Sequence, residues 1–194
     1  MNNNIHKYSN LSNKSDLQLW NEIREGNSDA LSKLFYRFYE DLFFYGKKLT
    51  NDNAHIADTI QNIFLKIMEL KNKNSNVTYV KAYIFKIFRN KLLKKKQKSL
   101  IYTLISDDFK YSDKNFIISI EDLIIEKETR LEKKKLISTL LKNLSPRQRE
   151  IIYLKFYMNF SNTEISNTLS INKQSVSNLL NRIFISLRKE IKKQ

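Results

Sequence analysis

The stretch SNTEISNTLSINKQSVSNLLNRI, residues 161–183, predicts two helices joined by a tight turn. Ser161 and Glu164 have the spacing of a capping box, which places a helix start directly after the serine. Asn172 can cap a second, longer helix. A short helix, a tight turn and a longer helix with a polar face form the helix-turn-helix arrangement.

The longer of these predicted helices has one apolar and one polar face. Its apolar positions recur at helical spacing and are expected to face the core: Val176, Leu179, Leu180, Ile183 and Leu187. The opposite face carries Lys173, Gln174, Ser177, Asn178, Asn181 and Arg182. Amide side chains pair well with adenine, arginine with guanine, and lysine with phosphate, so this face is typical of a helix that reads DNA.

Two helix junctions in this region carry polar residues where glycine is common. Asn159 precedes the first predicted helix, and Ser170 follows it. Such junctions often need a residue in the left-handed backbone conformation. Asparagine tolerates that conformation, whereas serine adopts it at a cost of about 1 kcal/mol.

The composition of the 194-residue chain indicates an all-α protein. Two glycines and one proline leave few residues for tight hairpin turns, which argues against a β-sandwich. The absence of cysteine excludes disulfides and thiolate chemistry, and with two isolated histidines we expect no metal and no other cofactor. No apolar run approaches the roughly 18 to 20 residues that a membrane span needs, so we expect a cytoplasmic protein.

Apolar periodicity predicts further helices before the helix-turn-helix. The expected segments run from Ser15 to Gly26, from after Asn27 to about Lys48, from 56 to 70, from Thr78 into the basic run 94–98, and from 131 to 144. Ser145, Pro146 and Gln148 give three agreeing signals for one more helix start, and we expect this helix to continue through Phe156.

Charge is distributed unevenly along the chain, whose formal net charge is +15. Residues 71–98 carry ten basic and no acidic side chains, and residues 131–194 carry 13 basic and four acidic ones. The intervening residues 99–130 are acidic and lack a sustained period, so we interpret them as a flexible linker. Two basic helical domains joined by a linker indicate a protein that binds a polyanion.

Four segments resemble parts of the sigma factors of bacterial RNA polymerase. LSPRQREIIYL at 144–154 looks like the opening of their region four, and NKQSVSNL at 172–179 looks like its recognition helix. DTIQNIFLK at 58–66 resembles the region-two helix that docks on the polymerase clamp, and YIFKIFRN at 83–90 resembles the following helix, which engages the minus-ten element. Their order is that of the small two-domain type, the extracytoplasmic-function sigma factors.

This resemblance implies two helical domains and a set of partners. Residues 10–98 would form region two, 99–130 an acidic linker, and 131–194 region four with its helix-turn-helix. The partners would be the clamp coiled coil and flap of RNA polymerase core, and promoter DNA, without a small-molecule substrate. Anti-sigma factors are common partners in the family, which makes one a candidate partner here.

The resemblance also implies roles for particular residues. Polymerase binding would fall to Asp58, Gln61, Asn62 and Leu65. Contacts with the minus-ten element would fall to Asn74, Asn76, Tyr79, Lys86, Arg89 and Asn90. Reading of the minus-thirty-five element would fall to Lys173, Gln174, Ser177, Asn178 and Arg182.

Three other classes of protein share some of these features. An autonomous helix-turn-helix regulator would share residues 144–190 but would need no docking helix at 58–66. A nuclease would need convergent carboxylates for metal ions, and the pairs Glu40–Asp41 and Asp107–Asp108 look like isolated solvated charges, so we expect no enzyme. A scaffold of helical hairpins would bind DNA weakly and without regard to sequence.

Overall fold

The computed structural model describes residues 14–69, 77–97, 116–117, 139, 141 and 143–191. These residues form helices, turns and connecting segments, and no strand occurs among them, which confirms the all-α prediction. The chain divides into two compact units, Met1–Ile101 and Tyr102–Gln194. In the part that is described, no helix is both long and apolar enough to span a membrane.

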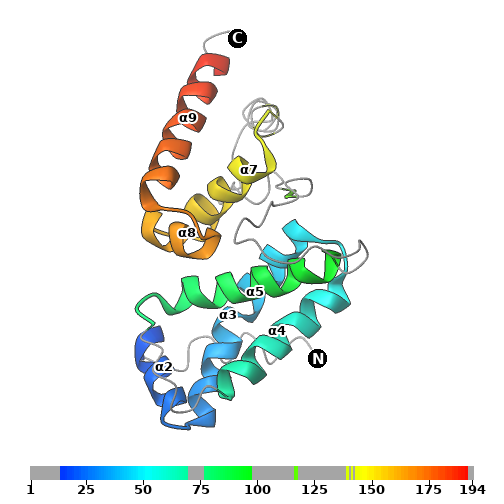
Figure 1. Ribbon diagram of the computed structural model, residues 1–194, viewed down its shortest axis with the longest axis vertical. Helices are drawn as coiled ribbons and strands as arrows, with labels where there is room; N and C mark the ends of the chain where they lie inside the picture. Colours follow the sequence, from blue (N-terminus) through cyan, green and yellow to red (C-terminus); the bar gives the residue numbers. More distant parts are fainter. Residues whose placement is uncertain are drawn as a thin grey trace, which may run out of the picture. The chain divides into compact units, whose positions relative to one another are not determined.

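The described residues of the first unit form four helices, each close to its predicted bounds (Figure 1). They are α2 (Asp16–Arg24), α3 (Ser28–Leu49), α4 (Asn53–Met68) and α5 (Val80–Gln97). The capping box at the start of α2 is present as predicted. Gly26, just after this helix, has a φ of 98°, a conformation that glycine adopts without steric cost.

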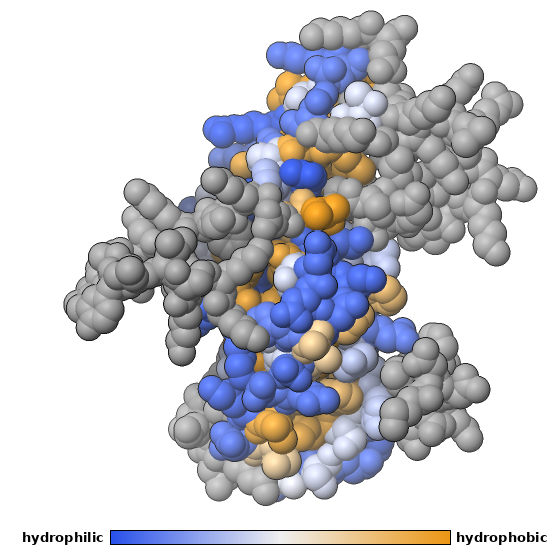
Figure 2. Space-filling view, turned by 90° about the vertical axis from the view of Figure 1, so that its right-hand side faces the viewer, coloured by the Kyte–Doolittle hydropathy of each residue, from blue (hydrophilic) through white to orange (hydrophobic). Residues whose placement is uncertain are grey.

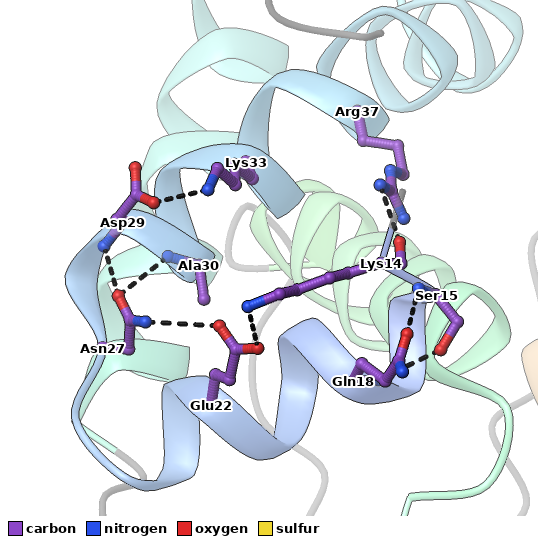
Figure 3. Close-up of polar contacts among 9 residues, drawn as sticks. All are labelled: Lys14, Ser15, Gln18, Glu22, Asn27, Asp29, Ala30, Lys33 and Arg37. Carbon is purple, nitrogen blue, oxygen red and sulfur yellow. Dashed lines mark hydrogen bonds and ion pairs between the residues drawn. The ribbon is translucent and has the colours of Figure 1, made fainter. Parts of the chain in front are cut away.

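Polar contacts fix the junction between α2 and α3 (Figure 3). The Asn27 side chain accepts hydrogen bonds from the backbone N–H groups of Asp29 at 3.0 Å and Ala30 at 3.2 Å, and so caps α3. Arg37 of α3 lies 2.6 Å from the Asp16 carboxylate at the start of α2. One contact thus holds the turn, and the other holds the start of α2 against the middle of α3.

The core of the first unit combines apolar stripes from all four helices. The isoleucines that the period predicted are buried in α4: Ile56, Ile60, Ile63 and Ile67. α5 contributes Val80, Ala82, Ile84, Phe85, Phe88 and Leu92. Trp20 of α2 is also buried, and its ring packs edge-on against Tyr83 with centroids 5.4 Å apart.

The second unit contains α7 (Pro146–Ile152), η1 (Tyr153–Tyr157), α8 (Asn162–Leu169) and α9 (Lys173–Ile191). The helix continues through Phe156 as expected, but its geometry changes from α to π at Tyr153. This change buries Tyr153 and Leu154 and leaves Phe156 exposed. Of the helix expected at 131–144, Thr139 and Leu141 are helical, and most of the rest lies outside the described residues.

One residue of the predicted linker belongs to the core of the second unit. Phe116 is 4% exposed, and its ring packs edge-on against Tyr153 with centroids 5.6 Å apart. Phe116 is therefore used for packing, whereas its neighbour Ile117 is exposed. Most of the predicted linker lies outside the described residues.

Gly46 of α3 lies where three helices come closest in the first unit. A Cβ atom at this position would lie 2.8 Å from Ile56 Cγ2 of α4 and 3.0 Å from Phe88 Cζ of α5. Real Cβ atoms do not approach other atoms this closely. α4 and α5 therefore pack against α3 at a distance that only glycine permits.

We expect Gly46→Ala to lower the free energy of unfolding of the first unit by about 1 to 3 kcal/mol, because the added methyl group overpacks the core. Helix propensity alone would change stability in the opposite direction by up to about 1 kcal/mol. Urea unfolding followed by the fluorescence of Trp20, the single tryptophan, measures the effect. Lys47→Ala, at the exposed neighbouring position, is the control, and an unchanged midpoint for Gly46→Ala would contradict this account.

Candidate nucleic-acid interface

The turn between α8 and α9 has the geometry that the sequence predicted. The capping box of Ser161 and Glu164 begins α8. After the turn, Asn172 caps α9 by accepting a hydrogen bond from the backbone N–H of Ser175 at 2.6 Å. α9 then turns away from α8, as Figure 1 shows. The two helices and their turn form a helix-turn-helix.

The two junctions without glycine adopt the left-handed conformation, as predicted. Ser170 ends α8 with φ 53° and ψ 44°, and Asn159 has φ 56°. The backbone N–H of Ser170 and that of Ile171 both bond to the Ser166 carbonyl, which closes the end of α8. The strain at Ser170 is therefore held by the hydrogen bonds of the turn.

An arginine of an ion pair in α7 also holds the end of α8 at this turn. Arg147 donates a hydrogen bond to the carbonyl of Leu169, the last residue of α8, at 3.1 Å. Its guanidinium also lies 3.4 Å from the carboxylate of Glu150, which is 1% exposed. A buried carboxylate needs such a partner, so the pair couples α7 to the end of α8. Sequence reasoning missed this pair, because Arg147 and Leu169 are 22 positions apart.

The predicted DNA-reading face of α9 is largely exposed. Its core stripe is buried at Val176, Leu180 and Ile183, whereas Leu179 and Leu187 are half-buried. The exposed predicted contacts are Lys173, Gln174, Asn178 and Arg182, and Ser177 is half-buried at the edge of the face. Burial of the stripe thus gives the helix the rotation that the sequence predicted.

Hydrogen bonds join the polar side chains of this face in two pairs. Gln174 donates to Asn178 at 3.0 Å, one helical turn further along. Asn162, the first residue of α8, donates to the Ser177 hydroxyl at 3.2 Å. Asn162 was absent from the predicted site, since the sequence does not show which residue of α8 faces α9.

The predicted polymerase-docking face lies on α4. Asp58, Gln61, Asn62 and Leu65 are all exposed, on the side of the helix away from the buried isoleucines. The Leu65 side chain is 56% exposed. Apolar side chains such as this interrupt the hydrophilic surface in several places, as Figure 2 shows for one face of the molecule. The face therefore offers polar groups and an apolar side chain to a protein partner.

The predicted minus-ten contacts differ in their exposure. Tyr79, just before α5, is 42% exposed; Asn90 is exposed, and Lys86 is half-buried. Asn74 and Asn76 lie outside the described residues. Among the described residues, Tyr79, Lys86 and Asn90 therefore remain candidate contacts with the minus-ten element.

The prediction for Arg89 needs correction. This side chain is 4% exposed and lies in the core of the first unit. Position 89 follows Phe85 by four residues and precedes Leu92 by three, so helical spacing puts it on their buried face. Arg89 is therefore not available as a surface contact for DNA.

Positive charge is concentrated where α4 and α5 lie side by side. Desolvation and, secondarily, the nearby charge of Lys66 lower the pKa of Lys91. Like charges near one another disfavour each other's charged forms, so these two lysines repel. Among the described residues, no cluster of histidine, aspartate and glutamate side chains could hold a metal ion.

A known protein family matches part of the second unit. Residues 134–187 match the family described as sigma-70, region 4. The second unit is a sigma-70 region 4 domain. This match covers the helix-turn-helix, the capped start of α7 and the turn between them, and it implies RNA polymerase and DNA as partners.

The whole fold has a counterpart among solved structures. The structure of CnrH in complex with the cytosolic domain of CnrY resembles this chain with a TM-score of 0.58 and 16% sequence identity, over 93% of this chain and 99% of that one. No curated protein matches the chain in sequence. The region 4 match confirms the identification as a sigma factor, and the similar structure shares the helical two-domain fold of this chain.

We expect Ser170→Gly to stabilise the helix-turn-helix by about 1 kcal/mol, because glycine adopts the left-handed conformation without the steric cost that serine has. Hydrogen exchange of the α8 and α9 amides measures the free energy of opening. The matched control is Ser166→Gly within α8, which should lose about 0.5 to 1 kcal/mol instead. Loss of protection in the Ser170→Gly variant would contradict the role given to this turn.

Proposed function

We propose that this sigma factor directs RNA polymerase to promoters by dividing recognition between its two units. The region 4 domain reads the upstream, minus-thirty-five element as duplex DNA in the major groove. The first unit, residues 10–98, binds polymerase core and engages the minus-ten element as it opens. The exposed polar face of α9, inside the segment that matches region 4, is the observation that carries this proposal.

The proposed polymerase contact is the α4 face that includes Asp58, Gln61, Asn62 and Leu65. These side chains are exposed on a helix whose other face is held in the core, so a partner can reach them without unfolding the domain. Flap binding would fall to region 4. An autonomous helix-turn-helix regulator, the competing function, would use the α9 face alone and would leave this surface of α4 without a role.

The proposed minus-ten contacts come from Tyr79, Lys86 and Asn90, together with Asn74 and Asn76. An aromatic side chain can stack on an unpaired base, which is worth roughly 1 to 3 kcal/mol and compares with the cost of unstacking that base. Tyr79 is the exposed aromatic residue just before α5 and suits this role. Recognition and opening of this kind need no covalent chemistry, so we propose a non-enzymatic protein acting in the cytoplasm.

A regulatory partner is also part of the proposal. CnrH was solved in complex with the cytosolic domain of CnrY, and its fold is similar to that of this chain over almost its full length. We expect this sigma factor to be held by an anti-sigma factor in a comparable way.

Charge reversal on α4 tests the docking face. We expect Asp58→Lys combined with Gln61→Ala to weaken binding to polymerase core about tenfold or more, since close charge and amide contacts are lost from the interface. The control, Glu25→Lys with Asn21→Ala, makes the same charge change at exposed positions, one on α2 and one at its C-cap. Binding is measured with labelled sigma factor and purified core. Equal affinity of both double variants would argue against docking through α4 and favour the autonomous regulator.

Two substitutions on α9 distinguish base reading from phosphate binding. Gln174→Ala should cost about 1 to 3 kcal/mol at one base pair and relax the preference there. Lys173→Ala should weaken all sequences alike and reduce the salt dependence of binding by about one unit of slope. Holoenzyme competing for single-base variants of its preferred upstream site at two salt concentrations gives both quantities. If Gln174→Ala weakens every variant equally, Gln174 does not read bases.

A further inference from the structure

Asn162 places a side-chain donor against the recognition helix from outside it. It is the first residue of α8, and its amide nitrogen lies 3.2 Å from the Ser177 hydroxyl of α9. The preceding residue, Ser161, already caps α8 through its capping box with Glu164. The Asn162 side chain is therefore not needed as a cap, and its contact is made to the helix that carries the proposed DNA contacts.

The hydrogen-bonding capacity of Ser177 is almost fully used within the protein. A serine hydroxyl has one donor hydrogen and two acceptor positions. Ser177 donates its hydrogen to the backbone carbonyl of Lys173 at 3.3 Å, and it accepts from Asn162. One acceptor position remains. In this arrangement Ser177 can accept a hydrogen bond from DNA, but it has no hydrogen left to donate.

We propose that Asn162 is a specificity-determining residue of the upstream-element interface. Its amide holds the Ser177 side chain in the rotamer from which the hydroxyl donates to the Lys173 carbonyl, and in that rotamer Ser177 is an acceptor only. This inference rests on the proposed function, in which α9 reads duplex DNA. In the major groove, adenine and cytosine present amino groups, which are donors, whereas guanine and thymine present carbonyl oxygens, which are acceptors. An acceptor-only hydroxyl accepts from adenine or cytosine and is repelled by the oxygen of guanine or thymine.

Without Asn162 the Ser177 side chain can leave this rotamer, and its hydroxyl is no longer held to the Lys173 carbonyl. A free hydroxyl rotates to suit its partner and can donate to a base oxygen as readily as it accepts from an amino group. Discrimination at one base pair should then fall, although Ser177 itself is still present. Asn162 is thus a positioning residue whose effect on DNA passes through Ser177.

The hydrogen-bonded pair Gln174 and Asn178, also on α9, does not orient a side chain from outside the helix in this way. Gln174 donates to Asn178 at 3.0 Å, and both partners belong to the same helix and are exposed. Asn162 and Ser177 instead join two helices, and both are half-buried. The orientation of Ser177 therefore depends on how α8 packs against α9.

The test uses holoenzyme assembled from full-length sigma factor and polymerase core, with a library of duplex promoter fragments randomised over the upstream element. Wild-type protein should select adenine or cytosine at one position by about tenfold over guanine and thymine. Asn162→Ala should reduce that preference to about threefold or less and leave the other positions unchanged. Ser177→Ala should abolish it, and the double variant should match Ser177→Ala.

Two further variants separate specificity from folding. Asn162→Leu keeps the size of the side chain without its donor and should behave like Asn162→Ala. Asn167→Ala, at an exposed position on α8, should leave every preference at its wild-type value. Thermal unfolding of each variant is recorded alongside, because a role in folding alone would lower the melting temperature without shifting preference at one base pair.

The outcomes also separate this inference from the proposed function. If wild-type holoenzyme selects no upstream sequence, both are overturned. If it selects a sequence but Asn162→Ala and Asn162→Leu keep the full preference, the inference alone is overturned. A loss that is equal for all sequences overturns it as well, because it would show that Asn162 contributes to affinity or stability without setting specificity.

Discussion

Burial of one apolar stripe of α9 determines which side chains the second unit can offer to DNA. Val176 and Ile183 are fully buried, and Leu180 is 6% exposed. An α-helix has 3.6 residues per turn, so fixing this stripe in the core also fixes the direction of the opposite face. The polar side chains of α9 point outward because the apolar ones are packed. Hydrogen bonds among the polar side chains affect only their local orientation. Recognition of DNA thus depends first on core packing.

The turn before α9 is held in place by a contact from α7. Ser170 adopts a strained left-handed conformation, and Arg147 of α7 bonds to the carbonyl of the residue before it. Glu150 is buried and its carboxylate lies 3.4 Å from the Arg147 guanidinium, and removing one partner of a buried ion pair is costly. A hydrogen bond thus links the start of α7 to the end of α8, directly before the turn that leads into the recognition helix.

The sequence predicted the local features of this protein more completely than the distant ones. Capping boxes at Ser15, Ser145 and Ser161 begin three helices as expected, because each is complete within four consecutive residues. The left-handed turn at Ser170 was likewise a local property. The predicted DNA-reading face of α9 followed from helical period, which holds wherever one stripe is strongly apolar.

What the sequence did not predict depends on contacts between distant segments. Arg89 stands in a basic run and suggested a DNA contact, yet its helical position among Phe85 and Leu92 puts it in the core. Phe116 stands in an irregular acidic segment and is buried by Tyr153, 37 positions further along. Asn162 meets Ser177 only because α8 and α9 pack at one particular register. No local pattern contains this information.

Repulsion between lysines of the first unit bears on its proposed binding to DNA. Desolvation and, secondarily, the nearby charge of Lys66 lower the pKa of Lys91, so charging this lysine is less favourable than charging a free side chain. A phosphate group near these lysines would relieve their repulsion, and salt would screen both effects. Because Arg89 is buried, the ten basic residues of 71–98 overstate the charge available at the surface. The affinity of this unit for DNA therefore depends on where its exposed lysines lie, more than on the net charge of the segment.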